Sequence, residues 1–219
     1  MAINLTKGQK IDLRKTTGET LTNFCVGVNW GAIEKKTLFG LSKSVTNIDL
    51  DLSCILIDDQ NNLVDHLYSP LYRVEVLQQF GLPKGKLLTA DAALKHTGDD
   101  LEGDKGGDDG LDNEIITVDL TKLDPKVTQI FFFLNNAGKE DFAQIPYAKI
   151  RMYEGTATRV QSVFADYNVS ADGQYSGKSS IIMGKLYKKN GEWKFSAIGD
   201  PTDDTFLGQT IHRIIKSYL

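Results

Sequence analysis

The chain has 219 residues, of which 41% are hydrophobic, so it can bury an ordinary globular core. Its formal charge is −4, and it carries no basic stripe with interleaved aromatic residues, which argues against a nucleic acid as its partner. Its longest apolar runs are far shorter than the roughly 20 residues that cross a bilayer, which excludes a membrane-spanning helix.

Two further features concern the compartment. The first residues contain no basic region followed by an apolar stretch, so we expect no secretory signal and a cytoplasmic protein. Cys25 and Cys54 both lie in apolar, strand-like runs, where a buried free thiol is the usual state. We therefore expect no disulfide.

Most of the chain consists of short segments rich in Val, Ile, Phe and Tyr and bounded by Gly, Asn, Asp or Pro, which predict strands. They are residues 22–30, 47–57, 63–68, 115–120, 127–134, 148–153, 159–164, 181–187 and 193–198. Asn190-Gly191 predicts a type I′ turn between the last two, and residues 58–62 predict another hairpin loop. The pattern predicts a mainly all-β fold, an antiparallel β-sandwich that forms one domain over residues 1–219.

Three patches have helical spacing, at residues 71–80, 139–145 and 205–218. In the last of them six apolar side chains share one stripe, and Asp203 and Asp204 stand where an N-cap and the positive helix end favour carboxylates. Such a stripe either packs on the sandwich or binds a partner, and the first arrangement is the more common one. We therefore expect a C-terminal helix packed on the sheet.

The negative charge is concentrated in one segment. Residues 99–114 hold eight acids and one base, a net −7, so the rest of the chain carries +3. Five glycines (Gly98, Gly103, Gly106, Gly107 and Gly110) allow the positive φ angles that a ligand-wrapping loop requires. Calcium takes roughly 6–8 oxygen ligands, mainly from carboxylates and carbonyls, and this segment offers both.

A second group of acids lies on a predicted strand. In residues 48–53 the side chains alternate, so that Asp49, Asp51 and Ser53 share one face while three apolar residues share the other. Neighbouring carboxylates on one face are costly without a counter-charge, and a metal shared with the acidic loop would remove that cost. The alternative is a solvated, mobile surface loop. An EF-hand is excluded because Lys105 and Gly106 interrupt its pattern.

Five segments together resemble the TerD family of bacterial calcium-binding stress and tellurium-resistance proteins, which includes TerZ-like and TerX-like members. They are Leu5-Thr-Lys-Gly-Gln9, Gly27-Val-Asn-Trp30, Asp49-Leu-Asp-Leu-Ser53, the loop from His96 to Glu114, and Gly191-Glu-Trp-Lys-Phe-Ser-Ala-Ile-Gly199. They occur in the family's order over essentially the whole chain.

The resemblance implies a β-sandwich whose acidic loop binds calcium, as two adjacent ions. By position it assigns the metal to Asp49, Asp51, Asp99, Asp100, Asp104, Asp108, Asp109 and Glu114. Two departures affect that set. Gly106 replaces an acidic residue of the family loop, and the family's Asp-Asp-Glu is spread out, so that either Asp112 or Glu114 completes the shell.

The resemblance further implies a non-enzymatic role in stress or tellurium resistance. The partners would be calcium ions and other proteins of the same resistance system, including membrane-associated ones. Residues 70–90 look like an insertion relative to shorter family members.

The sequence offers little for catalysis. His66, His96 and His212 are too scattered for a zinc site. Gly177-Lys178-Ser179 resembles the end of a phosphate-binding loop but lacks the upstream glycine, and an apolar strand follows it. His96 borders the acidic loop, where a histidine more often hydrogen-bonds a ligating carboxylate than acts as a general base. Because paired carboxylates also hold Mg²⁺, a magnesium-dependent phosphoester hydrolase is the alternative function.

Overall fold

The computed structural model describes residues 3–4, 8–14, 18–36, 43–169 and 173–219. Residues 5–7 of the opening motif lie outside these ranges, as does most of the stretch on which the expectation of no secretory signal rests.

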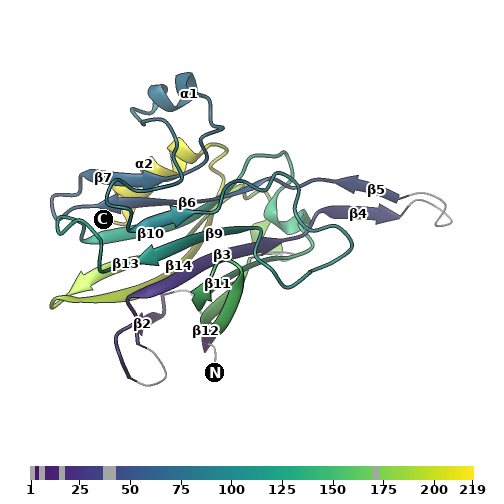
Figure 1. Ribbon diagram of the computed structural model, residues 1–219. Coiled ribbons are helices and arrows are strands. Elements are labelled where there is room, and N and C mark those ends of the chain that lie inside the picture. Colours follow the sequence, from purple (N-terminus) through teal and green to yellow (C-terminus); the bar gives the residue numbers. More distant parts are fainter. Residues whose placement is uncertain (1–2, 5–7, 15–17, 37–42, 170–172) are drawn as a thin grey trace.

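Two six-stranded sheets lie face to face and form the sandwich that the sequence predicts (Figure 1). One has the order β1-β12-β11-β3-β9-β8. Its strands are β1 (Ile3–Asn4), β3 (Asn23–Trp30), β8 (Leu94–His96), β9 (Glu114–Asp119), β11 (Ala148–Thr156) and β12 (Arg159–Asn168). Within the described ranges every strand pair is antiparallel except β1 with β12.

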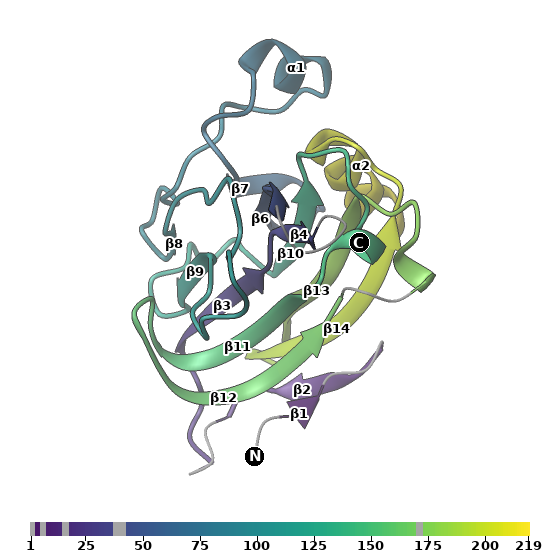
Figure 2. The ribbon, with the colours of Figure 1, turned by 90° about the vertical axis from the view of Figure 1, so that its right-hand side faces the viewer.

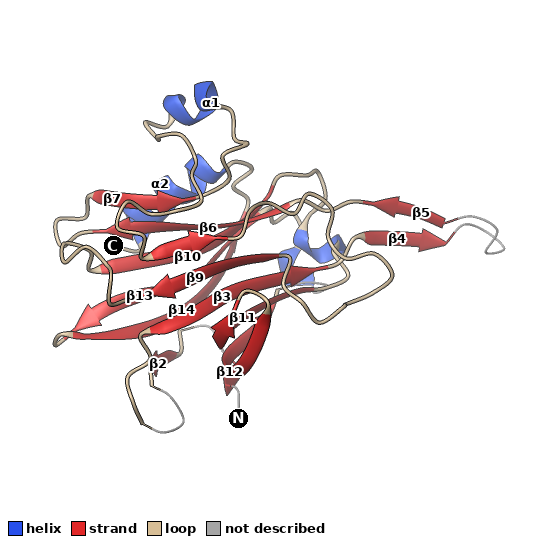
Figure 3. Cartoon of the chain, in the orientation of Figure 1, coloured by secondary structure: helices blue, strands red, loops and turns tan. Residues whose placement is uncertain are grey.

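The second sheet has the order β2-β14-β13-β10-β6-β7. Its strands are β2 (Lys10–Asp12), β6 (Leu50–Ile57), β7 (Leu63–Leu67), β10 (Gln129–Asn136), β13 (Ser180–Lys189) and β14 (Glu192–Thr202). A separate hairpin of β4 (Ile33–Lys36) and β5 (Lys43–Thr46) projects from one end of the sandwich (Figure 3).

Strands β6 and β10 of the second sheet are buried on both faces. Along β6, Leu50, Leu52, Cys54 and Leu56 enter the core between the sheets, while Ile55 and Ile57 pack on the other side. That outer face is covered by α2 (Leu207–Ser217), with α1 (Val74–Gln79) beyond it (Figure 2). The apolar stripe of α2 therefore packs on the sheet, and the expectation for the C-terminal helix is confirmed.

The start of α2 differs from the prediction. Neither Asp203 nor Asp204 caps it, because the helix begins after Phe206 and the Gln209 side chain accepts hydrogen bonds from the backbone N–H groups of Thr205 and Phe206. Asp204 instead accepts hydrogen bonds at 2.7 and 2.8 Å from Arg213, one to two turns into the helix. A carboxylate paired with a guanidinium is more strongly held than one that accepts from a backbone amide.

Other local predictions hold in part. Asn190 and Gly191 have φ angles of 54° and 81°, as a type I′ turn requires, and Asp58 N–H donates to the Asn62 carbonyl in the other hairpin. The patch at residues 139–145 is a single 3-10 turn, Phe142–Gln144, and a second such turn is Gly173–Tyr175. Both cysteines are buried and free, as expected. Within the described residues, no helix is long and apolar enough to cross a membrane.

Four strand ends meet at one end of the sandwich. β3 ends there at Trp30, β9 begins at Glu114, β6 begins at Leu50 and β10 ends at Asn136. Val28 is opposite Glu114 in one sheet and Asn135 is opposite Asp51 in the other. The Leu52 N–H of β6 donates to the Glu114 carboxylate of β9 and so links the two sheets. The acidic loop before β9 and the segment before β6 are therefore brought to the same place.

Candidate metal centre

The acidic loop is held against the end of β3. Asp104 N–H donates to the Trp30 carbonyl and the Asp104 carbonyl accepts from Ala32 N–H, both at 2.9 Å. The Trp30 indole, which is fully buried, donates to the Ile48 carbonyl at 2.8 Å, and Ile48 N–H in turn bonds the Glu102 carbonyl. One tryptophan thus fixes the acidic loop and the start of β6 relative to each other.

All five glycines of the loop have positive φ angles, as predicted. Gly103 shows the strictest requirement: its φ is 71°, and a Cβ there would stand 2.6 Å from the Trp30 ring. At Gly106, with φ 87°, a Cβ would meet nothing within 4 Å. The loop therefore needs glycine for its backbone at both positions, and for close packing at Gly103.

Three of the predicted carboxylates form an inner cluster, which we define as Asp51, Asp99 and Glu114. One oxygen from each lies within 4.8 Å of the others. Asp51 projects from β6, Glu114 from β9 and Asp99 from the loop between β8 and β9. Tyr72 donates to Asp51 at 2.7 Å and Ser69 donates to Asp99. Asp51 is 5% exposed and Glu114 fully buried, so water compensates little of their charge.

The burial of these acids is unfavourable for their charged forms. Burial raises the pKa of Asp51 well above the usual range. The hydrogen bond from Tyr72 opposes this rise, and the charges of Glu114, Asp49 and Asp99 add to it. Burial also raises the pKa of Glu114, although His96 and backbone donors oppose it. A cation placed among these oxygens would favour the charged carboxylates and so lower their pKa values again.

His96 orients Glu114 from behind. Its Nδ1 accepts from Gly98 N–H at 2.9 Å, so the proton is on Nε2, which lies 3.0 Å from the Leu52 carbonyl and 3.3 Å from Glu114. Glu114 also accepts from the N–H groups of Leu52 and Asp100. The histidine contacts a candidate ligating carboxylate, as the sequence suggested, and both of its nitrogens are engaged inside the protein.

Three other predicted residues form an outer cluster, which we define as Asp104, Asp108 and Asp109. Their oxygens also approach within 4.8 Å of one another, but Asp108 and Asp109 are exposed. Tyr147 donates to Asp104 at 2.9 Å, and Lys149 forms an ion pair with Asp108. That lysine lowers the pKa of Asp108. The outer cluster thus already has a positive neighbour.

The remaining predicted acids lie outside both clusters. Asp100 accepts from the N–H groups of Glu102 and Gly103 and from the Asn113 side chain, and so shapes the loop. Asp49 has a buried oxygen, Oδ1, without a hydrogen-bond partner among the described residues. Asp112 forms a two-oxygen ion pair with Arg151 and packs over Gly27. Geometry therefore favours Glu114 over Asp112 for completing a metal shell.

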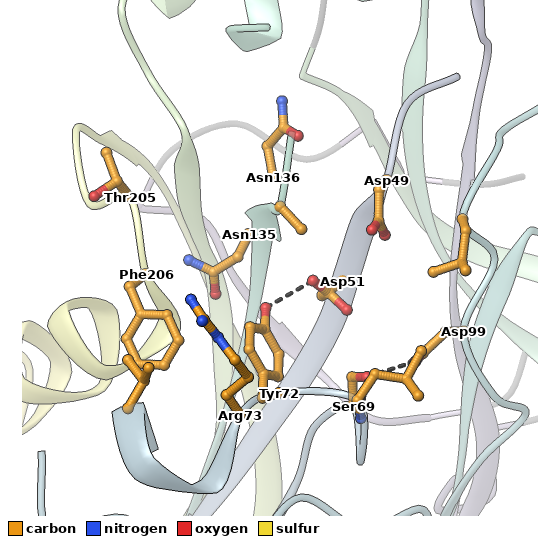
Figure 4. Close-up of a pocket in the computed structure, with 14 residues that line it drawn as sticks. Asp49, Asp51, Ser69, Tyr72, Arg73, Asp99, Asn135, Asn136, Thr205 and Phe206 are labelled. Carbon is orange, nitrogen blue, oxygen red and sulfur yellow. Dashed lines mark hydrogen bonds between the residues drawn. The ribbon is translucent and has the colours of Figure 1, made fainter. Parts of the chain in front are cut away.

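Beside the inner cluster lies a cavity of about 300 Å³, drawn in Figure 4. Asp49, Asp51 and Asp99 line one end of it, and Asn135, Arg73 and Phe206 line the other. The segment at residues 70–90, unexplained by the sequence, supplies a wall through Leu71, Tyr72, Arg73 and Val76. Nothing in the sequence spacing placed this segment next to the acids, because the contact is long-range.

Oxygen donors fit a calcium ion in both clusters. At the usual Ca–O distance of about 2.4 Å, two oxygens on one ion stand at most about 4.8 Å apart, which both clusters satisfy. The donor set contains no nitrogen or sulfur within the described residues, as a hard cation prefers. The unpartnered Asp49 oxygen and the raised pKa of Asp51 are further signs of an environment that favours a cation.

Comparison with known proteins identifies the family and agrees with the fold. The sequence profile of the TerD domain matches residues 1–213, so the chain belongs to the TerD domain family.

Particular relatives are similar over nearly their whole length. The chain is 31% identical to stress response protein SCP2 of Bacillus subtilis, covering 98% of this chain and 100% of that protein. It is 29% identical to tellurium resistance protein TerZ of Serratia marcescens, covering 90% and 89%. A homologue of telluride resistance protein (TerD), SCO6318 from Streptomyces coelicolor, shares the fold with a TM-score of 0.55 at 12% identity, covering 84% of this chain and 91% of that one.

Proposed function

We propose that this protein is a calcium-binding, non-enzymatic protein of a stress or tellurium-resistance system. The observation that carries the proposal is the inner cluster, in which two nearly water-free carboxylates and a third from the loop converge within 4.8 Å. Asp51, Asp99 and Glu114 would hold one ion, and Asp104, Asp108 and Asp109 a second.

Calcium would act mainly by ordering the acidic loop against the sandwich. Without a cation, the repulsion among buried carboxylates opposes the closed loop, and the ion replaces repulsion with coordination. At free calcium about a hundredfold above Kd, binding only to the folded state stabilises it by about 2.7 kcal/mol. The ordered loop is then a rigid surface on which other proteins of the same system, including membrane-associated ones, could assemble.

The resistance role rests on the relatives. SCP2 is named as a stress response protein and TerZ as a tellurium resistance protein, and both align with this chain over about nine-tenths of their length or more. A catalytic role is less well supported, since the histidine nearest the carboxylates is engaged at both nitrogens and stands behind Glu114, away from the cavity.

Calorimetric titration of chelator-treated protein tests the proposal. We expect heat on addition of Ca²⁺, with much weaker binding of Mg²⁺, because Mg²⁺ requires a tighter octahedral arrangement and gives up its water reluctantly. Turnover of generic phosphoesters with Mg²⁺, inhibited by Ca²⁺, would instead support the hydrolase. Absence of calcium heat would overturn the proposal.

A further inference from the structure

Two hydroxyl groups of one short segment, between β7 and α1, are bonded to the inner cluster. The Tyr72 hydroxyl donates to Asp51 at 2.7 Å (Figure 4). The Ser69 hydroxyl donates to Asp99 in the same view. The two acids come from different parts of the chain, a strand and the acidic loop, whereas their donors lie in one segment. This segment therefore holds two of the three inner carboxylates at once.

The two donors are themselves fixed by packing. The Tyr72 ring makes edge-on contacts with Tyr68 and Phe206, with ring centroids 6.4 and 5.5 Å apart. Ser69 is 4% exposed, and a Cβ on Gly85 would stand only 2.1 Å from the Ser69 carbonyl oxygen, so the two backbones are in close contact. Carboxylates that accept hydrogen bonds from such firmly packed donors have little freedom to move.

The third inner carboxylate is held from inside the sandwich. Glu114 accepts from Leu52 N–H at 2.7 Å and from Asp100 N–H at 3.1 Å. His96 Nε2 lies 3.3 Å from the same carboxylate. Every carboxylate of the inner cluster therefore has at least one protein donor that sets the position of its oxygens.

Fixed oxygens affect calcium and magnesium differently. Calcium accepts irregular arrangements of oxygens at about 2.3–2.6 Å, whereas magnesium requires a near-ideal octahedron at about 2.0–2.1 Å. A carboxylate that cannot shift cannot close in around the smaller ion. Because selectivity between the two ions depends on ligand number, cavity size and flexibility, donors that limit the movement of the ligands also favour calcium.

We propose that Ser69 and Tyr72 are positioning residues that make the inner site selective for calcium over magnesium, by fixing Asp99 and Asp51. The inference rests on the proposed calcium site and deepens it. It also gives the segment at residues 70–90 a role, since this segment contains Tyr72 and its Gly85 packs on Ser69.

The substitution Tyr72→Phe tests this, because it removes one hydroxyl and keeps the packed ring. Calorimetric calcium titration of the chelator-treated full chain, with and without excess Mg²⁺, gives the affinity of the inner site for both ions. We expect the calcium affinity to fall by about tenfold and the magnesium affinity by less than about threefold. Ser69→Ala should lower the ratio of the two affinities in the same direction, through Asp99.

Two other tyrosines provide matched controls. The Tyr68 hydroxyl donates to the Pro83 carbonyl at 2.6 Å and not to a carboxylate, so Tyr68→Phe should lower stability and leave the ratio of the two affinities unchanged. The Tyr147 hydroxyl donates to Asp104 of the outer cluster at 2.9 Å, so Tyr147→Phe should weaken only the outer binding event.

A calcium affinity of Tyr72→Phe within about twofold of wild type would overturn the inference. Equal weakening of both ions would also overturn it, because a general loss of structure lowers both affinities together. The failure of the proposed function looks different. If wild type binds calcium and Asp51→Asn loses the tighter event, an unchanged Tyr72→Phe sinks the inference alone, whereas a wild type that gives no calcium heat sinks both.

Discussion

The inner and outer clusters contain the same chemistry, three carboxylates each, in opposite surroundings. The inner one stands on two strands and is largely shielded from water, whereas the outer one lies on a glycine-rich loop with Lys149 beside it. Burial makes the charged forms of the inner carboxylates unfavourable, and a bound cation would compensate them. The outer carboxylates are already screened by solvent and paired with a lysine. The comparison predicts that two clusters of equal composition differ in their affinity for calcium.

The packing of Gly103 against Trp30, which positions the acidic loop for both clusters, gives the largest expected effect. Gly103→Ala would place a Cβ 2.6 Å from the Trp30 ring at a φ of 71°, so we expect a loss of about 2–4 kcal/mol in the free energy of unfolding. Gly106→Ala, with a similar φ but open space, should lose only about 1–2 kcal/mol. Urea denaturation measures both. Equal losses would show that Trp30 does not fix the loop.

Calcium should stabilise the protein mainly through the inner cluster. Saturating Ca²⁺ should raise the Tm of chelator-treated protein by about 5–10 °C, as expected for about 2.7 kcal/mol in a chain of this length. Asp51→Asn should remove most of that rise, and Asp108→Asn only a minor part. Differential scanning calorimetry in Ca²⁺ and in chelator measures this rise in Tm. If Asp108→Asn loses more of the rise than Asp51→Asn, the inner cluster is not the main calcium site.

Metal-free protein should respond to pH through Asp49. Burial, followed by the charges of Asp99 and Asp100, raises the pKa of Asp49 from 3.8 to about 6. A raised folded-state pKa gives stability that is present below about pH 4 and lost as pH rises through about 6. Wild type relative to Asp49→Asn should therefore gain about 1–2 kcal/mol between pH 7.5 and 4.5, allowing for partial exposure.

The pH effect is measured as this difference because His66, whose pKa burial lowers, changes stability in the opposite direction in both proteins. Denaturant midpoints at the two pH values, in chelator, provide the measurement. With Ca²⁺ present the difference should shrink. A difference that is zero or of the opposite sign in chelator would show that Asp49 is not in the environment described here.

The smallest effect concerns the lysine of the outer cluster. Lys149→Gln removes a cation that competes for Asp108, so calcium affinity there should rise by about threefold, as expected for an exposed ion pair worth less than 1 kcal/mol. Added salt should reduce the gain. Titration at two ionic strengths checks this. An unchanged affinity would mean that Lys149 and calcium do not compete.

The sequence predicted the sandwich, the C-terminal helix and the five loop glycines because each depends on local patterns of alternation, helical spacing or backbone freedom. It missed short strands such as β2 and β8, which have three residues each and too few positions for a pattern. It misplaced the cap of α2, since the pairing of Asp204 with Arg213 depends on tertiary geometry.

The candidate site divides in the same way. The residue types were visible in the sequence, but their partition into two clusters was not, because it depends on which strand ends meet. Tyr72 and Ser69 were missed entirely, since they approach the acids from a segment with no acidic or metal-like pattern of its own. Glu114 could be separated from Asp112 only once Arg151 was seen to pair with the latter.

Calcium titration of chelator-treated wild type, Asp51→Asn and Asp108→Asn by calorimetry tests the central claim most directly. We predict two binding events in wild type, with the tighter one absent from Asp51→Asn and the weaker one absent from Asp108→Asn. A wild type that gives no heat, or an Asp51→Asn variant whose titration is indistinguishable from that of wild type, would contradict the account.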